Sequence, residues 1–201
     1  MAGTILVSTA YLPPVEYFTL LSGADKVLIE KEENYIKQTY RNRCYILTSN
    51  GPLLLSVPVL QGSFHKTSLK EIRIDYSKRW QQVHLRAMIA AYKSSPFFEF
   101  YFDTIERIIL ANNHFLIDLN LELILFIINT LKLDIEVSYT TVFIPEAGEP
   151  HDFRYKLYPK SPEQRQQKEY TQVFSSENRF VPGLSIADLI FNSGPDSVYY
   201  L

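Results

Sequence analysis

The feature that most constrains the fold is a strand, a helix and a second strand near the start of the chain. The β-branched, apolar run Thr4–Ser8 predicts the first strand, and Lys26–Glu30 predicts the next one. Between them, Pro14 suits the first position of a helix and Gly23 suits its C-terminal cap, so we expect a short helix from about Pro14 to Ser22. A helix that connects two strands is typical of an α/β layer arrangement.

Further along the chain, hydrophobic periodicity predicts more helices and strands. Helices are expected over about residues 78–93, 96–110 and 118–131. Strands are expected over about residues 69–75 and 135–144. The third of these helices is apolar nearly all round, which indicates a central position in the core. The predicted fold class is α/β: a mixed β-sheet with an early strand-helix-strand unit, packed against a cluster of three or more helices.

Size and composition predict one domain. The chain has 201 residues, of which 46% are hydrophobic and 14% are aromatic, and this is enough to bury a substantial core. We expect a single domain over residues 1–201, with a polar, mobile segment near residues 145–172.

Several features predict a cytoplasmic protein that does not insert into a membrane. Cys44 is the only cysteine, so no internal disulfide can form, as is usual in a reducing compartment. The first residues lack the basic start of a signal peptide. The most apolar run, Leu119–Leu133, contains Glu122, Asn129 and Lys132 and is too short to span a bilayer.

The overall charge limits the classes of partner. The net charge is -2 and the pI is near 6.1, whereas general nucleic-acid binding normally needs a basic surplus. We therefore expect no nucleic acid as a partner. A local basic stripe can still bind one small anion, so the expected partner is a phosphate- or carboxylate-containing small molecule. The sequence leaves a homo-oligomer open.

The stretch Tyr35–Val59 contains such a basic stripe. If it begins as one extended strand, successive side chains leave opposite faces, and one face then carries Tyr35, Lys37, Arg41 and Arg43. Guanidinium groups bind phosphate or carboxylate in a two-pronged, charge-assisted way. The stripe is therefore the best candidate for an anion site.

Two questions about this stripe stay open. Its charges can instead belong to a solvated face that Glu30–Glu33 neutralises. Regular alternation also turns Asn42 away from its neighbouring arginines. Asn42 therefore either reaches them through a bulge or ties the strand to the core, and we favour the tie.

A second candidate site lies on the helix predicted over residues 78–93. Trp80 and His84 share one of its faces, and a histidine can act as a general base near neutral pH. The alternative is a core histidine with a satisfied hydrogen bond. The turn Tyr11-Leu12-Pro13-Pro14 follows the first strand, a position where α/β proteins often bind ligands, although it can equally be a rigid turn.

Motifs for common cofactors and metals are missing from the sequence. The chain has no glycine-rich nucleotide-binding motif, no nucleophile elbow and no cysteine or histidine pair at zinc spacing. We therefore predict no metal site, and the sequence leaves any cofactor unknown.

Several short motifs, in order along nearly the whole chain, together resemble the WbqC-like family. They are Tyr11-Leu12-Pro13 with Tyr17-Phe18, Tyr35 and Lys37 before Arg41-Asn42-Arg43, Val57-Pro58-Val59, Trp80 with His84, Ala91-Tyr92, Pro96-Phe97-Phe98, Leu184 to Leu189, and Asn192 to Pro195. One departure is Thr9-Ala10, where members of the family often carry Gln-Pro.

This resemblance implies a role in surface-polysaccharide (O-antigen-like) biosynthesis. It implies a transferase-type enzyme that binds a phosphate-containing donor and moves an acyl or aminoacyl group to an amino sugar. The resemblance favours one pocket for the catalytic base and the ligand-binding residues. The base is His84, and the ligand-binding residues are Tyr11, Tyr35, Lys37, Arg41, Asn42, Arg43 and Trp80. The alternative is a non-catalytic ligand-binding or scaffolding module of a polysaccharide-biosynthesis complex, so the sequence does not decide whether the chain is an enzyme.

Overall fold

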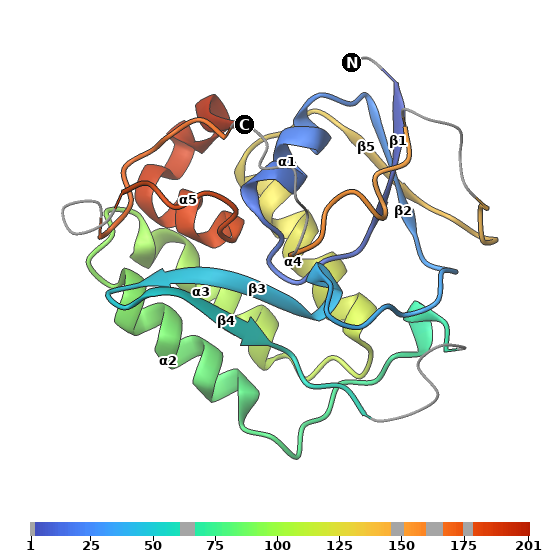
Figure 1. Cartoon of the computed structure of the whole chain (residues 1–201), viewed down its shortest axis with the longest axis horizontal. Helices are drawn as coiled ribbons and strands as arrows, with labels where there is room; N and C mark the ends of the chain where they lie inside the picture. Colours follow the sequence, from blue (N-terminus) through green and yellow to red (C-terminus); the bar gives the residue numbers. More distant parts are fainter. Residues whose placement is uncertain (1–2, 61–66, 146–150, 160–166, 175–178) are drawn as a thin grey trace.

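The computed structural model describes residues 3–60, 67–145, 151–159, 167–174 and 179–201. In these residues, five α-helices accompany a parallel three-stranded sheet and an antiparallel two-stranded sheet (Figure 1). The α/β class that the sequence predicts is therefore confirmed, with the strands divided between two sheets.

The parallel sheet contains the strand-helix-strand unit. Its order is β1 (Thr4–Ser8), β2 (Lys26–Glu30) and β5 (Glu136–Tyr139), and both pairings are parallel. Helix α1 (Val15–Ser22) connects β1 to β2. The bounds of β1 and β2 are those predicted, whereas β5 is shorter than the strand predicted over residues 135–144.

A segment from much later in the chain pairs with the other edge of β1. The amide of Leu6 donates to the carbonyl of His151 at 2.9 Å, and the amide of Phe153 donates back to Leu6 at 2.8 Å. Leu6 and Asp152 thus form a parallel bridge. The mobility expected for residues 145–172 stays a prediction, and residues 146–150 and 160–166 lie outside the described part of the chain.

The antiparallel sheet is the hairpin β3 (Arg43–Thr48) and β4 (Gly51–Ser56). The extended strand expected from Tyr35 onward is wrong before Arg43, because residues 40–42 form a 3₁₀ helix instead. Two local features interrupt the strand: Gln38 has a φ of 62°, and the side chain of Thr39 accepts a hydrogen bond from the amide of Arg41. The parity argument for the basic stripe therefore fails at this point.

The next three helices agree closely with the predictions: α2 (Trp80–Tyr92), α3 (Phe98–Leu110) and α4 (Leu116–Thr130). A further helix, α5 (Ile186–Ser193), lies near the C-terminus. Most of α4 is buried, so its predicted central position is confirmed. The strand predicted over residues 69–75 is wrong. That region contains a 3₁₀ helix, Leu69–Glu71, followed by isolated bridges.

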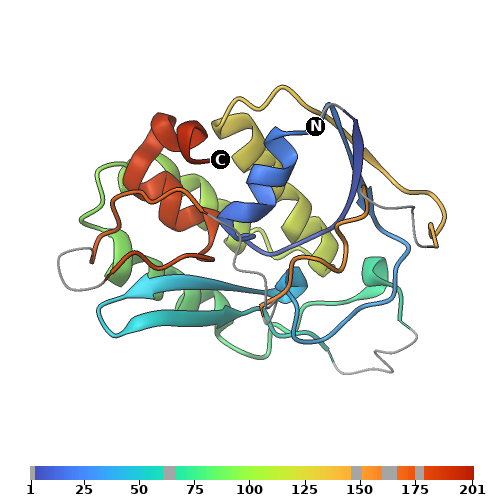
Figure 2. The ribbon, with the colours of Figure 1, turned by 45° about the horizontal axis from the view of Figure 1, so that its top comes forward.

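The hairpin lies between two helices. Figures 1 and 2 show α2 on one side of the hairpin and α5 on the other, with α1 beside α5. On α4, the buried Asn120 donates to the carbonyl of Arg41 at 2.8 Å and to Thr9 at 3.2 Å. The core helix therefore holds the end of β1 and the start of the hairpin together.

Candidate functional site

The carboxyl end of β1 opens into a cleft made of two hollows. β1 ends at Ser8, and Thr9 and Ala10 then line the inner hollow. The outer hollow has a volume of about 290 Å³. Tyr40 and Leu157 line both hollows, so we describe the two together as the β1 cleft. Ligands of α/β proteins usually bind at the carboxyl ends of parallel strands.

Charged and aromatic side chains line the outer hollow. Glu16 comes from the first turn of α1, Tyr40 from the 3₁₀ helix, and Tyr45 from β3. Lys156 and Tyr158 come from the segment that pairs with β1. Burial, together with the charge of Glu16, raises the pKa of the Tyr40 hydroxyl, so this group stays protonated and can donate a hydrogen bond.

The backbone turn behind the cleft is strained. Leu12, in the turn after β1, is fully buried and has a φ of 39°, a conformation that costs energy for a residue with a side chain. The amide of the preceding Tyr11 donates to the carbonyl of Tyr40 at 2.9 Å. Such strain is often found at functional sites, and here the surrounding contacts fix the turn against a wall of the cleft.

Arg41 points into the protein, where Glu33 binds it. Its Nε donates to Oε1 of Glu33 at 3.0 Å and its Nη2 donates to Oε2 at 2.6 Å, while Nη2 also donates to the hydroxyl of Ser8 at 2.7 Å. The side chains of Arg41 and Glu33 are 4% and 1% exposed. The carboxylate of Glu33 therefore neutralises the charge of Arg41. This agrees with the alternative in which Glu30–Glu33 balance the basic stripe, except that the pair is buried instead of solvated.

Arg154 forms a second buried network next to the first. Its Nε donates to Asp152 at 3.0 Å, and its Nη1 donates to Glu30 at 3.0 Å and to the carbonyl of Ile144 at 2.7 Å. Glu30 also accepts a hydrogen bond from the hydroxyl of Thr140 at 2.6 Å. The side chains of Arg154 and Glu30 have no exposed surface.

These two networks form what we call the buried ion cluster: Glu30, Glu33, Arg41, Asp152 and Arg154. Arg41 and Arg154 also line the inner hollow of the β1 cleft. Breaking a buried pair leaves an uncompensated charge and is strongly unfavourable. The cluster therefore fixes the inner wall of the cleft, and carboxylates already bind both guanidinium groups.

Three of the predicted site residues form an aromatic cluster elsewhere. The hydroxyl of Tyr11 lies 2.9 Å from Nδ1 of His84. The ring of Trp80 is 5.2 Å from the ring of His84 and 6.4 Å from the ring of Tyr11, both edge-on. All three side chains are buried.

His84 is held as a neutral imidazole. Burial lowers its pKa to about 4, although a hydrogen bond with the backbone of Ser56 opposes this shift. Burial also raises the pKa of Tyr11, so its hydroxyl keeps its proton, and the tautomer of His84 decides which of the two groups donates in their hydrogen bond. These contacts match the alternative of a core histidine, and a catalytic role for His84 stays a prediction.

The remaining members of the basic stripe differ in exposure. Tyr35 is buried, and this burial raises its pKa to about 12, against the opposing charges of Arg43 and Arg41. Arg43 is half-buried in β3, while Lys37 is exposed in the turn before the 3₁₀ helix. Ligand binding by these residues stays a prediction.

Asn42 ties the start of the hairpin to the chain that leaves it. Its Nδ2 donates to the carbonyl of Val57 at 2.9 Å and lies 3.4 Å from the hydroxyl of Ser56. In turn, the amide of Val57 donates to the carbonyl of Asn42 at 2.8 Å. These contacts agree with the alternative in which Asn42 ties its strand to the rest of the protein instead of reaching the neighbouring arginines through a bulge.

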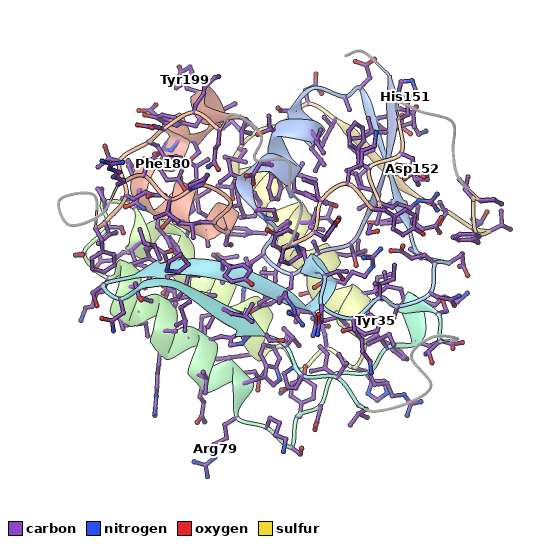
Figure 3. The ribbon with its side chains drawn as sticks, in the orientation of Figure 1. Tyr35, Arg79, His151, Asp152, Phe180 and Tyr199 are labelled. Atoms are coloured by element: carbon purple, nitrogen blue, oxygen red, sulfur yellow. The ribbon has the colours of Figure 1, made fainter. Side chains whose placement is uncertain are left out.

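The predicted histidine and arginine lie in different hollows. Arg41 lines the inner hollow of the β1 cleft, whereas His84 lines a groove between β4 and α2. Figure 3 shows Asp152 in the upper right of the molecule, while Arg79, which lines the groove with His84, projects from its lower end. The described hollows therefore do not bring His84 and Arg41 to one surface.

Sequence reasoning missed the residues that line the outer hollow. Glu16 follows the predicted helix start at Pro14, and this position could have identified it as a polar group at the end of the first strand. Tyr40 is next to Arg41, but the strand prediction turned it to the wrong face. Lys156 reaches the cleft through long-range pairing of its segment with β1, for which the local sequence carries no signal.

Two further observations limit the chemistry. Within the described ranges, no group of three or more histidine, cysteine, aspartate or glutamate side chains is arranged to hold a metal ion. The helices in the same ranges are all too short or too polar to cross a membrane.

Together, the parallel strands and the cleft at their carboxyl ends define an α/β protein with a hollow of ligand size. The family model of the WbqC-like protein family matches residues 9–160 of the chain. The chain therefore belongs to the WbqC-like family, and the matched range begins directly after β1 and includes the hairpin, the buried ion cluster and His84.

One relative extends this comparison to a named protein. The chain is 32% identical over 115 residues to the "Uncharacterized protein Rv1507c" of Mycobacterium tuberculosis. The alignment covers 57% of this chain and 49% of that protein, so the chain spans about half the length of the relative. No solved structure matches the chain.

Proposed function

We propose that this protein is a cytoplasmic transferase-type enzyme of surface-polysaccharide biosynthesis, with its substrates in the β1 cleft. It binds a phosphate-containing donor and moves an acyl or aminoacyl group to an amino sugar. The family resemblance supports the reaction class. The observation that carries the choice of site is the outer hollow, where Glu16, Lys156 and three tyrosines lie at the carboxyl end of β1.

The side chains of the outer hollow suit a hydroxylated ligand with an amine and a phosphate. Tyr40, Tyr45 and Tyr158 offer aromatic faces for a sugar ring and hydroxyls for its polar groups. The carboxylate of Glu16 can accept hydrogen bonds from an acceptor amine, and the ammonium of Lys156 can bind a donor phosphate. Holding both substrates together lowers the entropic part of the barrier to transfer.

In this proposal, the residues predicted from the sequence support the cleft from behind. Arg41 fixes its inner wall through Glu33 and Ser8. His84 bonds to Tyr11, and the amide of Tyr11 bonds to Tyr40, so His84 is a positioning residue two contacts away from the cleft.

A thermal-shift series with UDP-linked amino sugars, free amino sugars and inorganic phosphate tests the site. A ligand at a hundred times its Kd adds about 2.7 kcal/mol. For a chain of this size, that corresponds to a rise in Tm of about 5–11 °C. We expect the UDP-linked amino sugars to give the largest rise.

Matched variants locate the response. Glu16→Gln should reduce the response to amino sugars, and Lys156→Ala should reduce the response to phosphate-bearing ligands. The controls are Glu136→Gln and Lys26→Ala, which change the same residue types in an exposed pair at the amino end of the parallel sheet. Equal responses in the cleft variants and the controls would rule out the β1 cleft as the ligand site.

A non-catalytic ligand-binding or scaffolding module is the second candidate. The observation that favours it is the state of the reactive groups, because burial raises the pKa of the Cys44 thiol and lowers that of His84 to about 4. Incubation with an acyl donor and an amino sugar, followed by mass spectrometry, separates the two candidates. Ligand binding without any acylated sugar would favour the module.

A further inference from the structure

Helix α2 and the residues next to it carry an unusual charge pattern. Residues 76–98 contain Lys78, Arg79, Arg86 and Lys93 and no aspartate or glutamate, in a chain with a net charge of -2. His84 adds no charge near neutral pH, because burial lowers its pKa. The nearest carboxylate in sequence, Asp75, precedes this stretch, and its pKa is lowered by hydrogen bonds from Ser77 and, to a smaller extent, by the charge of Lys78. The basic residues of this stretch therefore have no acidic residue within it that could neutralise their charge.

The same side of the molecule has an open strand edge. β4 pairs with β3 on one side only, and within the described residues no strand pairs with its other side. Leu53 and Leu54 in β4 are 39% and 40% exposed. Natural proteins usually protect such edges with charged residues or proline. Residues 51–60 carry no charge, but Pro52 has no N–H and the backbone of Ser56 already bonds to His84, so the open part of the edge is around Leu54.

A groove joins the open edge to the basic helix. Its volume is about 320 Å³, and its lining includes Leu54, Leu55 and Ser56 from β4, Arg79 directly before α2, and Trp80, Val83 and His84 from α2. Val83 is 59% exposed. Figure 1 shows β4 lying along α2, and Figure 3 shows the side chain of Arg79 projecting from the start of the helix. The groove shares no lining residue with the β1 cleft.

We propose that this β4–α2 groove binds an extended, acidic segment of a partner protein. The segment adds to the edge of β4 as a third strand, and its backbone pairs with β4 around Leu54, between Pro52 and the Ser56 backbone that bonds to His84. Its apolar side chains pack on Leu54 and Val83, and its carboxylates meet Arg79 and Arg86. Alternation of acidic and apolar residues is the pattern that places these two kinds of side chain on opposite faces of a strand.

Charge complementarity selects the occupant. Arg86 is three residues after Val83 and therefore lies next to it on the surface of α2, so apolar and basic groups alternate along the exposed face. An anionic membrane would also meet basic and apolar groups, but it would not use the hydrogen-bonding edge of β4. A protein segment uses all three features.

Fluorescence anisotropy with a labelled peptide tests the proposal. The probe is six residues long, the length of β4, and alternates glutamate with valine. A lysine–valine peptide of the same length is its control. We expect the glutamate–valine peptide to bind and the lysine–valine peptide to bind at least about tenfold more weakly, with an affinity that falls as salt screens the charges.

Two charge-reversal variants locate the binding. Arg79→Glu should weaken binding of the glutamate–valine peptide about tenfold. Lys93→Glu is the matched control, because Lys93 follows Arg79 by about 21 Å along the helix. Backbone amide NMR shifts should move at Gly51–Ser56.

Several results would overturn the proposal. They are a glutamate–valine peptide that does not bind or binds no better than the lysine–valine peptide, equal affinities in the two variants, and amide shifts that leave β4 unchanged. Binding to phosphatidylserine vesicles without binding to the peptide would assign the surface to a membrane instead. These outcomes are independent of any ligand in the β1 cleft.

Discussion

The buried pair of Glu33 and Arg41 allows a direct test of whether Arg41 is structural or binds a ligand. Arg41→Met removes two hydrogen bonds to Glu33 and one to Ser8. It also leaves the carboxylate of Glu33, which is 1% exposed, without its cation. Removing one partner of a buried pair costs about 3–5 kcal/mol. We expect the free energy of unfolding to fall by that amount.

The assay is urea unfolding followed by circular dichroism, with a thermal scan beside it. For a chain of this size, a loss of about 3–5 kcal/mol lowers Tm by about 6–20 °C. The double variant Glu33→Met with Arg41→Met should recover most of the loss, because neither charge is then left unpaired. Lys26→Met is the control, since it breaks the exposed pair with Glu136 and should leave Tm nearly unchanged.

The opposite outcome would refute this reasoning. If Arg41→Met unfolds like the wild type but no longer responds to phosphate-bearing ligands, Arg41 is a binding residue, as the basic stripe predicts. If the double variant is as unstable as the single one, the cost comes from lost packing of the arginine chain instead of the unpaired carboxylate.

Three further predictions concern buried titratable groups. Burial raises the pKa of Asp188 to about 6, so the folded state holds a proton that the unfolded chain releases nearer pH 4. Stability should therefore fall as pH rises through this window, and Asp188→Asn should flatten that part of the urea-unfolding profile. Burial lowers the pKa of His84 to about 4, so the stability linked to neutral His84 should be lost as pH falls from about 6.5 to 4; an NMR titration with a midpoint above 6 would contradict this. Burial raises the pKa of the Cys44 thiol, so thiol reagents should label Cys44 only as urea unfolds the protein, and rapid labelling without urea would contradict its burial.

The parts of the fold that could be predicted depend on local pattern. β1 and β2 are short apolar runs between turn residues, and their predicted bounds agree with the structure. The helix α3 has strong periodicity and α4 is a long run that is apolar nearly all round, and such local patterns predict helices without tertiary information. The strand predicted from Tyr35 failed because one residue with positive φ and one side-chain cap, at Gln38 and Thr39, ended the extended backbone. Alternation of residue types carries no signal for such a break.

The candidate site was harder to predict because its walls come from distant parts of the chain. The sequence placed the turn at Tyr11 correctly after the first strand, and this turn does adjoin the β1 cleft. Lys156 and Arg154 reach the cleft only because the segment around Asp152 pairs with β1. Glu30 and Arg154 are 124 residues apart, and no local pattern relates them.

The two basic regions of the chain show which charge patterns identify a binding surface. Arg41 follows Glu33 by eight residues, and the chain folds back so that this nearby carboxylate binds it. Arg79 and Arg86 have no acidic neighbour on α2, and within the described ranges no salt bridge to either of them is formed. A cation with acidic residues close in sequence can find an internal partner, whereas a cation in a stretch free of acids stays available on the surface. By this reasoning, Arg41 stabilises the fold, and Arg79 and Arg86 are the cations available for a partner.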